Sequence, residues 1–149
     1  MKNYSGDERV VINITITKDN YKELEDIVKM AKENGFRGVS CNIYTPTIGE
    51  CSPMFIAREE RKPIISELKR VKSLYPSCFL LNTEMIKWYE YPDHRDSCHW
   101  RDEVLHLDVS WNTRTCFANA DCSNCGCLAG SIRNPLKMLK SPIEMMKLA

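Results

Sequence analysis

The stretch VVINITITKDNYKELEDIVKMAKENGFRGVSCNIY, residues 10–44, decides the predicted fold of this chain. Residues 10–17 are β-branched almost throughout, which is typical of a strand buried on both faces. Residues 38–44 show a second strand pattern. Between them, apolar residues recur three and four positions apart, as on one face of a helix; they are Leu24, Ile27, Val28 and Ala31. We therefore predict a strand, a helix and a second strand.

Boundary residues mark both ends of this predicted helix. Asn20 followed by Glu23 has the spacing of a capping box, in which two side chains bond free N–H groups of the first turn. Gly35 stands where helices commonly end with a left-handed residue. The helix is therefore expected to begin just after Asn20 and to end before Gly35.

Polar side chains alternate along both predicted strands. The alternating positions are Asn13, Thr15 and Thr17 in the first strand, and Ser40, Asn42 and Tyr44 in the second. Alternate residues of a strand share one face, so each strand has a polar face. Such a face suits the inside of a barrel or a cleft better than a packed core.

The same pattern continues as far as residue 90. A second helix is predicted from an apolar stripe: Ile64, Ile65, Leu68, Val71 and Tyr75. A short third strand, Cys78 to Asn82, and a brief helix through Met85 to Tyr89 follow. Strands separated by amphipathic helices predict an α/β fold with parallel strands and right-handed crossovers.

The pattern changes near Tyr91, where we place a boundary. Residues 104–109 and 114–117 are predicted to form an antiparallel hairpin around the turn at residues 110–113. Trp111 and Asn112 occupy the tip, and Asn112 is the residue expected to tolerate left-handed backbone angles. Two short helices are expected to begin at Asn134-Pro135 and Ser141-Pro142.

Composition narrows the classes of function. A net charge of +1 gives no bulk reason to expect nucleic acid or an acidic membrane surface as a partner. The first ten residues lack the apolar segment of a secretory signal, and no apolar run is long enough to span a membrane. We therefore expect a cytoplasmic protein, in which eight cysteines indicate metal or redox chemistry rather than disulfides.

The eight cysteines separate into two groups. Cys41 and Cys78 lie on predicted strands and are interpreted as small buried hydrophobic residues, while Cys51 lies in a loop without a supported role. The other five follow residue 91: Cys98, Cys116, Cys122, Cys125 and Cys127. Of the first four, Cys122 and Cys125 form a CxxC pair, and the antiparallel hairpin can bring Cys98 and Cys116 beside it. Four thiolates around one point suit either tetrahedral zinc or a 4Fe–4S cluster, which leaves Cys127 over.

Other candidate residues receive structural interpretations. We expect His94 and His99 to be surface residues, although His99 is a possible ligand beside Cys98, and His106 to pack across the hairpin. The run REERK, residues 58–62, is interpreted as a solvated helix start rather than a nucleic-acid patch. We identify no Ser/His/Asp set, phosphate-binding loop or HExxH motif.

Residues 12–46 and 58–82 together resemble the second half of the radical S-adenosylmethionine (radical SAM) barrel. In that family a strand with a polar inner face is followed by an N-x-x-E-L helix, matched here by NYKEL, and by a strand ending in a proline-containing loop, matched by NIYTP. The cysteine-rich region resembles the twitch or SPASM extension, which holds an auxiliary iron–sulfur cluster. The resemblance implies a partial (β/α) barrel over residues 1–90 and a twitch/SPASM-like cysteine-rich extension over residues 91–149.

The resemblance further implies an auxiliary 4Fe–4S cluster bound by Cys98, Cys116, Cys122 and Cys125. Asn13, Asn42 and Asn82, near strand ends, are then the expected cofactor- or substrate-binding residues. The CxxxCxxC loop that defines the family is absent, so the chain is not expected to be catalytic by itself, and S-adenosylmethionine is expected only if the barrel is completed. An N-terminal half-barrel polypeptide or self-association would complete it.

Two other functions remain open at this point. The same four cysteines would hold zinc in a non-catalytic interaction module. Alternatively, Cys122 and Cys125 would form the redox pair of a thiol oxidoreductase, although such pairs usually precede a helix that lowers the thiol pKa, and Gly126 interrupts any helix here.

Overall fold

Two parallel strands form the centre of the protein in a computed structural model that describes residues 6–95, 98, 100, 105–114, 116 and 120–128. Strand β1 (Val11–Ile16) pairs with β2 (Gly38–Ile43) along its whole length, from Val11 opposite Gly38 to Ile16 opposite Ile43. Three α-helices within the described residues accompany this sheet, so the mixed α/β class with parallel strands is confirmed. The described residues do not form a barrel.

The connection between β1 and β2 is the predicted helix, α1 (Leu24–Glu33), which follows a short 3₁₀ turn, Tyr21–Glu23. Gly35 has a φ of +69°, and the Phe36 N–H donates to the Ala31 carbonyl at 3.0 Å, which closes the helix as predicted. Asn20 stands at the predicted N-cap position, before the 3₁₀ turn, but the predicted capping box is wrong because Asn20 makes no side-chain cap bond. Its amide group instead ties down the end of β1, accepting from the Thr17 N–H at 2.9 Å.

The second half of the unit contains α2 (Arg61–Leu74), which follows a 3₁₀ turn at Arg58–Glu60, and α3 (Thr83–Glu90). The predicted third strand is reduced to a single parallel bridge between Val39 and Phe79. Two hydrogen bonds of 2.8 Å flank that bridge, from Val39 N–H to the Cys78 carbonyl and from Leu80 N–H to the Val39 carbonyl. Asn82 already caps α3, so few residues remain for an extended strand.

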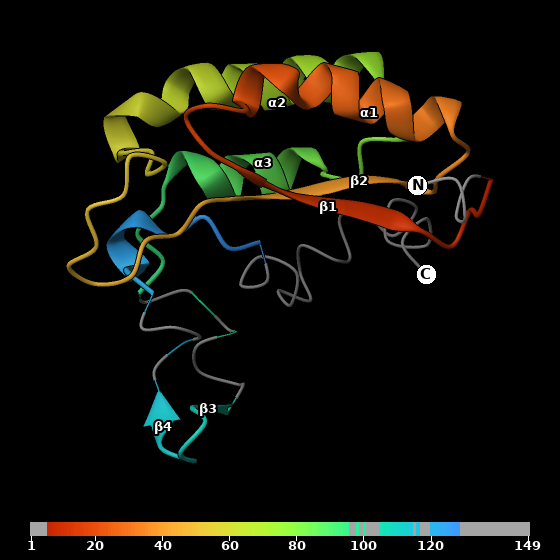
Figure 1. The fold of residues 1–149 in the computed structure, drawn as a ribbon. Helices are drawn as coiled ribbons and strands as arrows, with labels where there is room; N and C mark the ends of the chain where they lie inside the picture. The colour runs from red at the N-terminus through yellow and green to blue at the C-terminus, as the bar shows by residue number, and fades with distance from the viewer. Residues whose placement is uncertain are drawn as a thin grey trace.

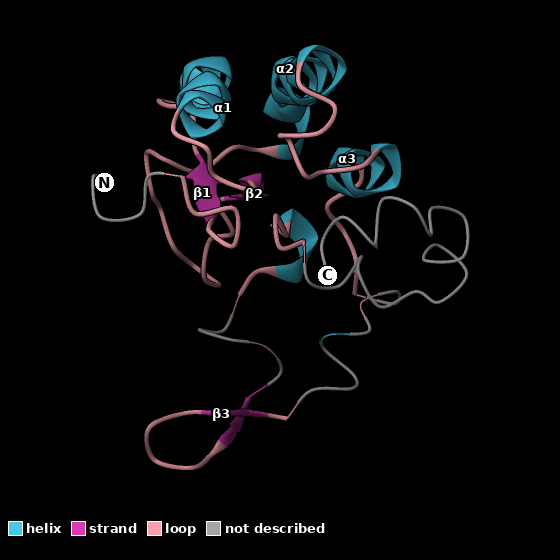
Figure 2. Cartoon of the chain, turned by 90° about the vertical axis from the view of Figure 1, so that its right-hand side faces the viewer, coloured by secondary structure: helices cyan, strands magenta, loops and turns pink. Residues whose placement is uncertain are grey.

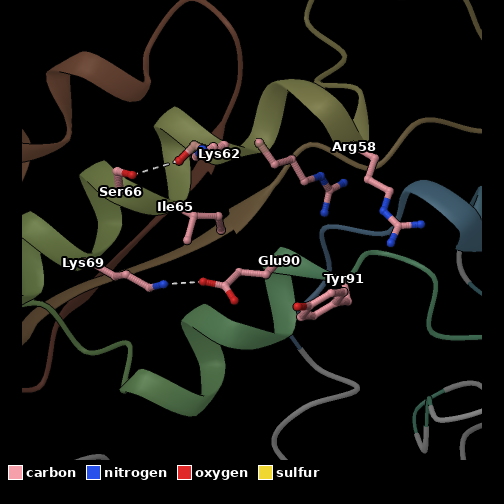
Figure 3. Close-up of a pocket in the computed structure, with 8 residues that line it drawn as sticks. Arg58, Lys62, Ile65, Ser66, Lys69, Glu90 and Tyr91 are labelled. Atoms are coloured by element: carbon pink, nitrogen blue, oxygen red, sulfur yellow. Dashed lines mark hydrogen bonds and ion pairs between the residues drawn. The ribbon is translucent and has the colours of Figure 1, made fainter.

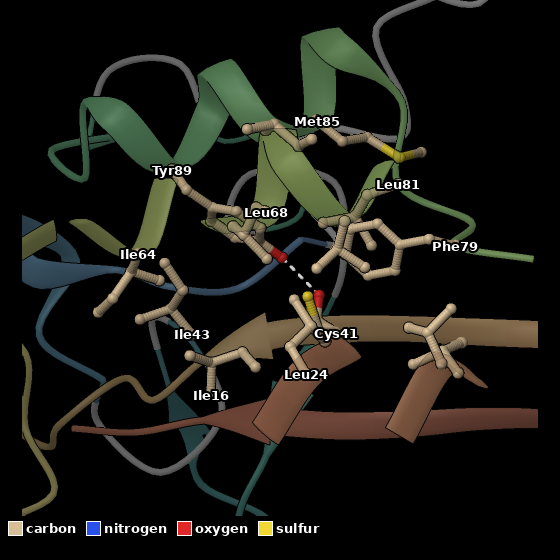
Figure 4. Packing of buried hydrophobic residues seen from close by; sticks show 14 of the residues in the cluster. Ile16, Leu24, Cys41, Ile43, Ile64, Leu68, Phe79, Leu81, Met85 and Tyr89 are labelled. Carbon is tan, nitrogen blue, oxygen red and sulfur yellow. Dashed lines mark hydrogen bonds between the residues drawn. The ribbon is translucent and has the colours of Figure 1, made fainter. Parts of the chain in front are cut away.

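Figures 1 and 2 show how α1, α2 and α3 are placed relative to the sheet. Helices α1 and α2 lie side by side over one face of the sheet, and α3 lies next to α2 on the side of β2 (Figures 1 and 2). The core fills the space between sheet and helices, and Figure 4 shows its packing around Cys41, Phe79 and Tyr89. The apolar faces of α1 and α2 supply its upper wall. The buried stripe predicted for α2 is confirmed at Ile64, Ile65, Leu68 and Val71.

A small hairpin lies apart from this unit in both views (Figures 1 and 2). It pairs β3 (His106–Leu107) with β4 (Thr113–Arg114). β3 lies inside the predicted first arm, but β4 begins at Thr113, which was predicted to belong to the turn. The Asp108 carboxylate accepts from the Ser110 and Asn112 N–H groups at 2.8 and 2.9 Å and so organises the turn. Trp111, with a φ of +65°, is the left-handed residue, so the assignment of that role to Asn112 is wrong.

The two predicted C-terminal helices, His99, and the outer parts of the predicted hairpin arms at residues 104, 115 and 117 lie outside the described residues. In the ranges that are described, none of the helices combines the length and apolar character needed to cross a lipid bilayer.

Candidate functional site

Residues 120–128, here called the cysteine loop, pack against the carboxyl end of β2. The loop carries Cys122, Cys125 and Cys127. The Ile43 N–H donates to the Gly126 carbonyl at 2.9 Å, and the Gly126 N–H donates to Thr45 Oγ1 at 2.8 Å. The cysteine loop is therefore joined to the α/β unit by backbone hydrogen bonds at the point where β2 ends.

Gly126 is required by the closeness of this approach. A Cβ atom at this position would lie 2.0 Å from the Ile43 carbonyl oxygen, which is far inside van der Waals contact. Directly after the glycine, the Trp88 indole N–H donates to the Cys127 carbonyl at 3.0 Å, and Leu128 is buried in the core. Only glycine fits at this position, because any side chain would push the loop away from β2.

Asp121 shapes the start of the cysteine loop. Its carboxylate accepts from the Ser123 N–H at 3.0 Å and from the Asn124 side-chain amide at 2.7 Å, and it caps the 3₁₀ turn Cys122–Asn124. Burial by itself would raise the pKa of Asp121, but these hydrogen bonds outweigh it and the pKa is lowered. The ionised carboxylate therefore holds the turn that presents Cys122.

Arg61 connects the cysteine loop to the helices. Its side chain is 1% exposed, and its guanidinium group donates to the carbonyl oxygens of Asn124 at 2.6 Å and Cys125 at 2.8 Å. A third bond of 3.3 Å reaches the carbonyl of Tyr89 in α3. Desolvation lowers the pKa of Arg61 to about 10, so the group remains a buried cation at neutral pH.

The interpretation of residues 58–62 as a solvated helix start is wrong at Arg61. Its neighbours Arg58 and Lys62 are exposed, but Arg61 stands three and four positions before Ile64 and Ile65 and so begins the apolar stripe of α2. A cation in phase with an apolar stripe was the available signal. The high charge of residues 58–62 hides this phase relation in the sequence.

The predicted metal ligands partly come together around Cys125. This thiol is 9% exposed, and burial raises its pKa to about 12. The Cys127 N–H donates to its Sγ at 3.3 Å and opposes that shift. The thiols of Cys127, Cys98 and Cys122 add to the rise in pKa by electrostatic repulsion, so Cys98 lies within electrostatic range of the loop although it is distant in sequence.

Cys116, the remaining predicted ligand, is buried, and Cys98 and Cys122 are half-buried. Thiols are a donor set that suits zinc and iron–sulfur clusters. Within residues 6–95 and the described later positions, no three Cys, His, Asp or Glu side chains are already arranged to hold a metal ion. The donor chemistry of these four predicted ligands fits a thiolate centre.

The predicted cofactor-binding asparagines occupy two different places. Asn13 lies on β1 opposite Ser40, and Asn42 lies on β2 opposite Thr15. The Asn42 Nδ2 donates to Asn13 Oδ1 at 3.5 Å. The Asn42 oxygen also accepts from the Leu128 N–H at 2.9 Å, so this polar face touches the cysteine loop. Asn82 is used differently, because its oxygen accepts from the Met85 N–H at 2.8 Å and caps α3.

The other cysteines and the histidines complete the comparison. Cys41 and Cys78 are buried as predicted, and Cys51 is exposed. The prediction for His94 is wrong: the residue is 5% exposed, and its ring stacks on Trp88 with 3.5 Å between ring centroids. Its Nε2 also lies 2.9 Å from the Trp88 carbonyl oxygen, so contacts with α3 hold this histidine away from solvent.

No family model, curated protein or solved structure matches this chain.

Proposed function

We propose that this chain is the C-terminal part of a radical SAM enzyme and that Cys98, Cys116, Cys122 and Cys125 bind an auxiliary 4Fe–4S cluster. The observation that carries the proposal is the buried Cys125 thiol in the cysteine loop, which follows the turn that begins at Cys122 and lies within electrostatic range of Cys98. Cys98, which is distant in sequence, and Cys122 thus both act on this sulfur atom, which supports the proposal. When bound, such a cluster supplies electron transfer or a structural anchor.

The electrical environment of Cys125 supports an anionic centre. The Arg61 guanidinium lies against the Cys125 backbone and acts on its thiol, and among the described residues Arg61 has no carboxylate partner. A buried cation without a counter-ion favours negative charge nearby. The Cys127 N–H bond to Cys125 Sγ works in the same direction, because N–H donors stabilise thiolate sulfur.

The sheet supports the barrel part of the proposal. β1, β2 and the bridge at Phe79 follow one another in parallel, as successive barrel strands do. Asn13 and Thr15 are exposed on the face of β1 that would line the inside. We propose that a polypeptide supplying the first half of the barrel, or a second copy of this chain, covers that face. Binding of S-adenosylmethionine would require the completed barrel.

Anaerobic purification followed by iron, sulfide and zinc analysis tests the ligand assignment. Serine substitutions at the four proposed ligands should each lower bound iron and sulfide sharply, while Cys51→Ser, an exposed matched control, should leave both unchanged. Stoichiometric zinc in a colourless protein would instead identify a zinc-stabilised interaction module. Unchanged metal content in all four variants would refute a thiolate centre of either kind.

The thiol oxidoreductase is less favoured by the structure than a metal centre. The reactive cysteine of a redox CxxC pair usually stands at the start of a helix, which lowers the pKa of its thiol. Cys122 instead begins a 3₁₀ turn of three residues, Cys122–Asn124, and not an α-helix. Rapid reduction of insulin by the metal-free protein would reverse this ranking.

A further inference from the structure

A cationic cavity of about 340 Å³ lies between α2 and α3. Figure 3 shows Lys69 of α2 reaching Glu90 at the end of α3, with Arg58 of the preceding 3₁₀ turn and Tyr91 nearby. Lys62 of α2 also lines the cavity. The volume is at the lower end of the range of small-molecule sites, which is roughly 300–1,000 Å³. The cavity therefore has room for a small molecule.

The charge of the cavity is strongly unbalanced. Arg58, Lys62, Lys69 and Arg61 line it, and among the described lining residues Glu90 is the only carboxylate. Glu90 pairs with Lys69, which leaves the positive charges of the other three uncompensated within the cavity. Arg58 and Lys62 form no ion pair with any part of the chain that the structure describes. Such a concentration of cations on a concave surface attracts an anion.

Arg61 gives the cavity a buried polar wall. Its Nε–H is inaccessible to solvent and has no hydrogen-bond partner among the described residues, although its two terminal nitrogens bond to carbonyl oxygens. A buried donor without a partner costs about 1–3 kcal/mol. An anion in the cavity would stabilise this buried charge and offer an acceptor close to the free donor.

We propose that this cavity binds the phosphate group of a small phosphate monoester. Arginine and lysine side chains are the usual partners of phosphate oxygens. Arg58 and Lys62 are one helical turn apart and would contact the phosphate from the same side. The exposed ring of Tyr91 and the side chain of Ile65 provide an apolar surface for the organic part of the ligand.

None of the described lining residues is a proposed metal ligand, although Arg61 borders both this cavity and the cysteine loop, so metal content and phosphate binding are measured separately. Binding is measured on the full chain by isothermal titration calorimetry with three probes: adenosine monophosphate, inorganic phosphate and adenosine. The monophosphate should bind, phosphate should bind more weakly, and adenosine should not bind measurably. Equal affinity for the monophosphate and for phosphate would overturn the monoester assignment, and failure of both to bind would overturn the site.

Variants separate a built site from general attraction between charges. The double variant Arg58→Gln/Lys62→Gln should weaken binding of adenosine monophosphate at least about tenfold. The matched control, Lys22→Gln/Lys29→Gln, removes the same charge from exposed positions outside the cavity and should leave affinity nearly unchanged. Glu90→Gln should tighten binding because it frees Lys69. Equal losses in the two double variants would refute the proposal.

Discussion

Replacing Arg61 with methionine tests whether this buried residue fastens the cysteine loop to the α/β unit. The guanidinium group bridges α2 to the carbonyl oxygens of Asn124 and Cys125, with a further bond to Tyr89 in α3. Methionine fills a similar volume but donates no hydrogen bond. Arg61→Met should therefore free the loop while leaving the helix stripe apolar.

The expected loss follows from the three acceptors that Arg61 satisfies. Each buried carbonyl left without a donor costs about 1–3 kcal/mol. Part of this is recovered, because the variant no longer buries a charge. We expect the free energy of unfolding to fall by about 3 kcal/mol, which for a chain of this size lowers Tm by about 6–12 °C.

Denaturant unfolding of Arg61→Met, Arg61→Lys and Arg70→Met provides the measurement. Lysine keeps the charge but cannot form the forked contacts, so it should rescue only part of the loss. Arg70 lies on the same helix in exposed ion pairs with Glu25 and Glu67, and its removal should cost less than about 1 kcal/mol. Equal destabilisation by Arg61→Met and Arg70→Met would refute this role of Arg61. So would an unchanged rate of Cys125 labelling in the native Arg61→Met protein.

Three further predictions test the packing around β2. Gly126→Ala should cost about 3 kcal/mol, because its Cβ would meet the Ile43 carbonyl at 2.0 Å, and an unchanged thermal midpoint would contradict that contact. Tyr89→Phe should cost about 1–2 kcal/mol by removing the 2.7 Å bond from its hydroxyl group to the buried Cys41 carbonyl, as denaturant unfolding can measure. In timed alkylation followed by peptide mapping, exposed Cys51 should react long before Cys41, whose pKa burial raises well above the ordinary value; equal rates would contradict the burial.

Local patterns predicted the α/β unit well. The β-branched run of β1, the apolar spacing in α1 and the left-handed Gly35 all depend on neighbours within one or two turns, so the sequence contains the necessary information. The third strand was overestimated because α3 begins directly after it and shortens it to one bridge. That outcome depends on how two adjacent elements divide the same few residues.

The candidate site was less predictable because it depends on contacts between distant segments. Spacing identified the cysteines, but no pattern in the cysteine loop indicates that Gly126 contacts Ile43 or that Leu128 joins the core. Arg61 and His94 were misjudged for a related reason. Each is a polar residue whose burial is possible only through partners supplied elsewhere in the chain or by a neighbouring helix.

The central claim is that cysteine sulfur atoms from separate segments surround one metal centre. X-ray absorption spectroscopy of the anaerobically purified chain measures the ligands of that metal directly. The proposed cluster predicts iron with a first shell of sulfur alone and a second shell of iron. A first shell of nitrogen or oxygen atoms, or a protein without bound metal after anaerobic reconstitution, would contradict the claim.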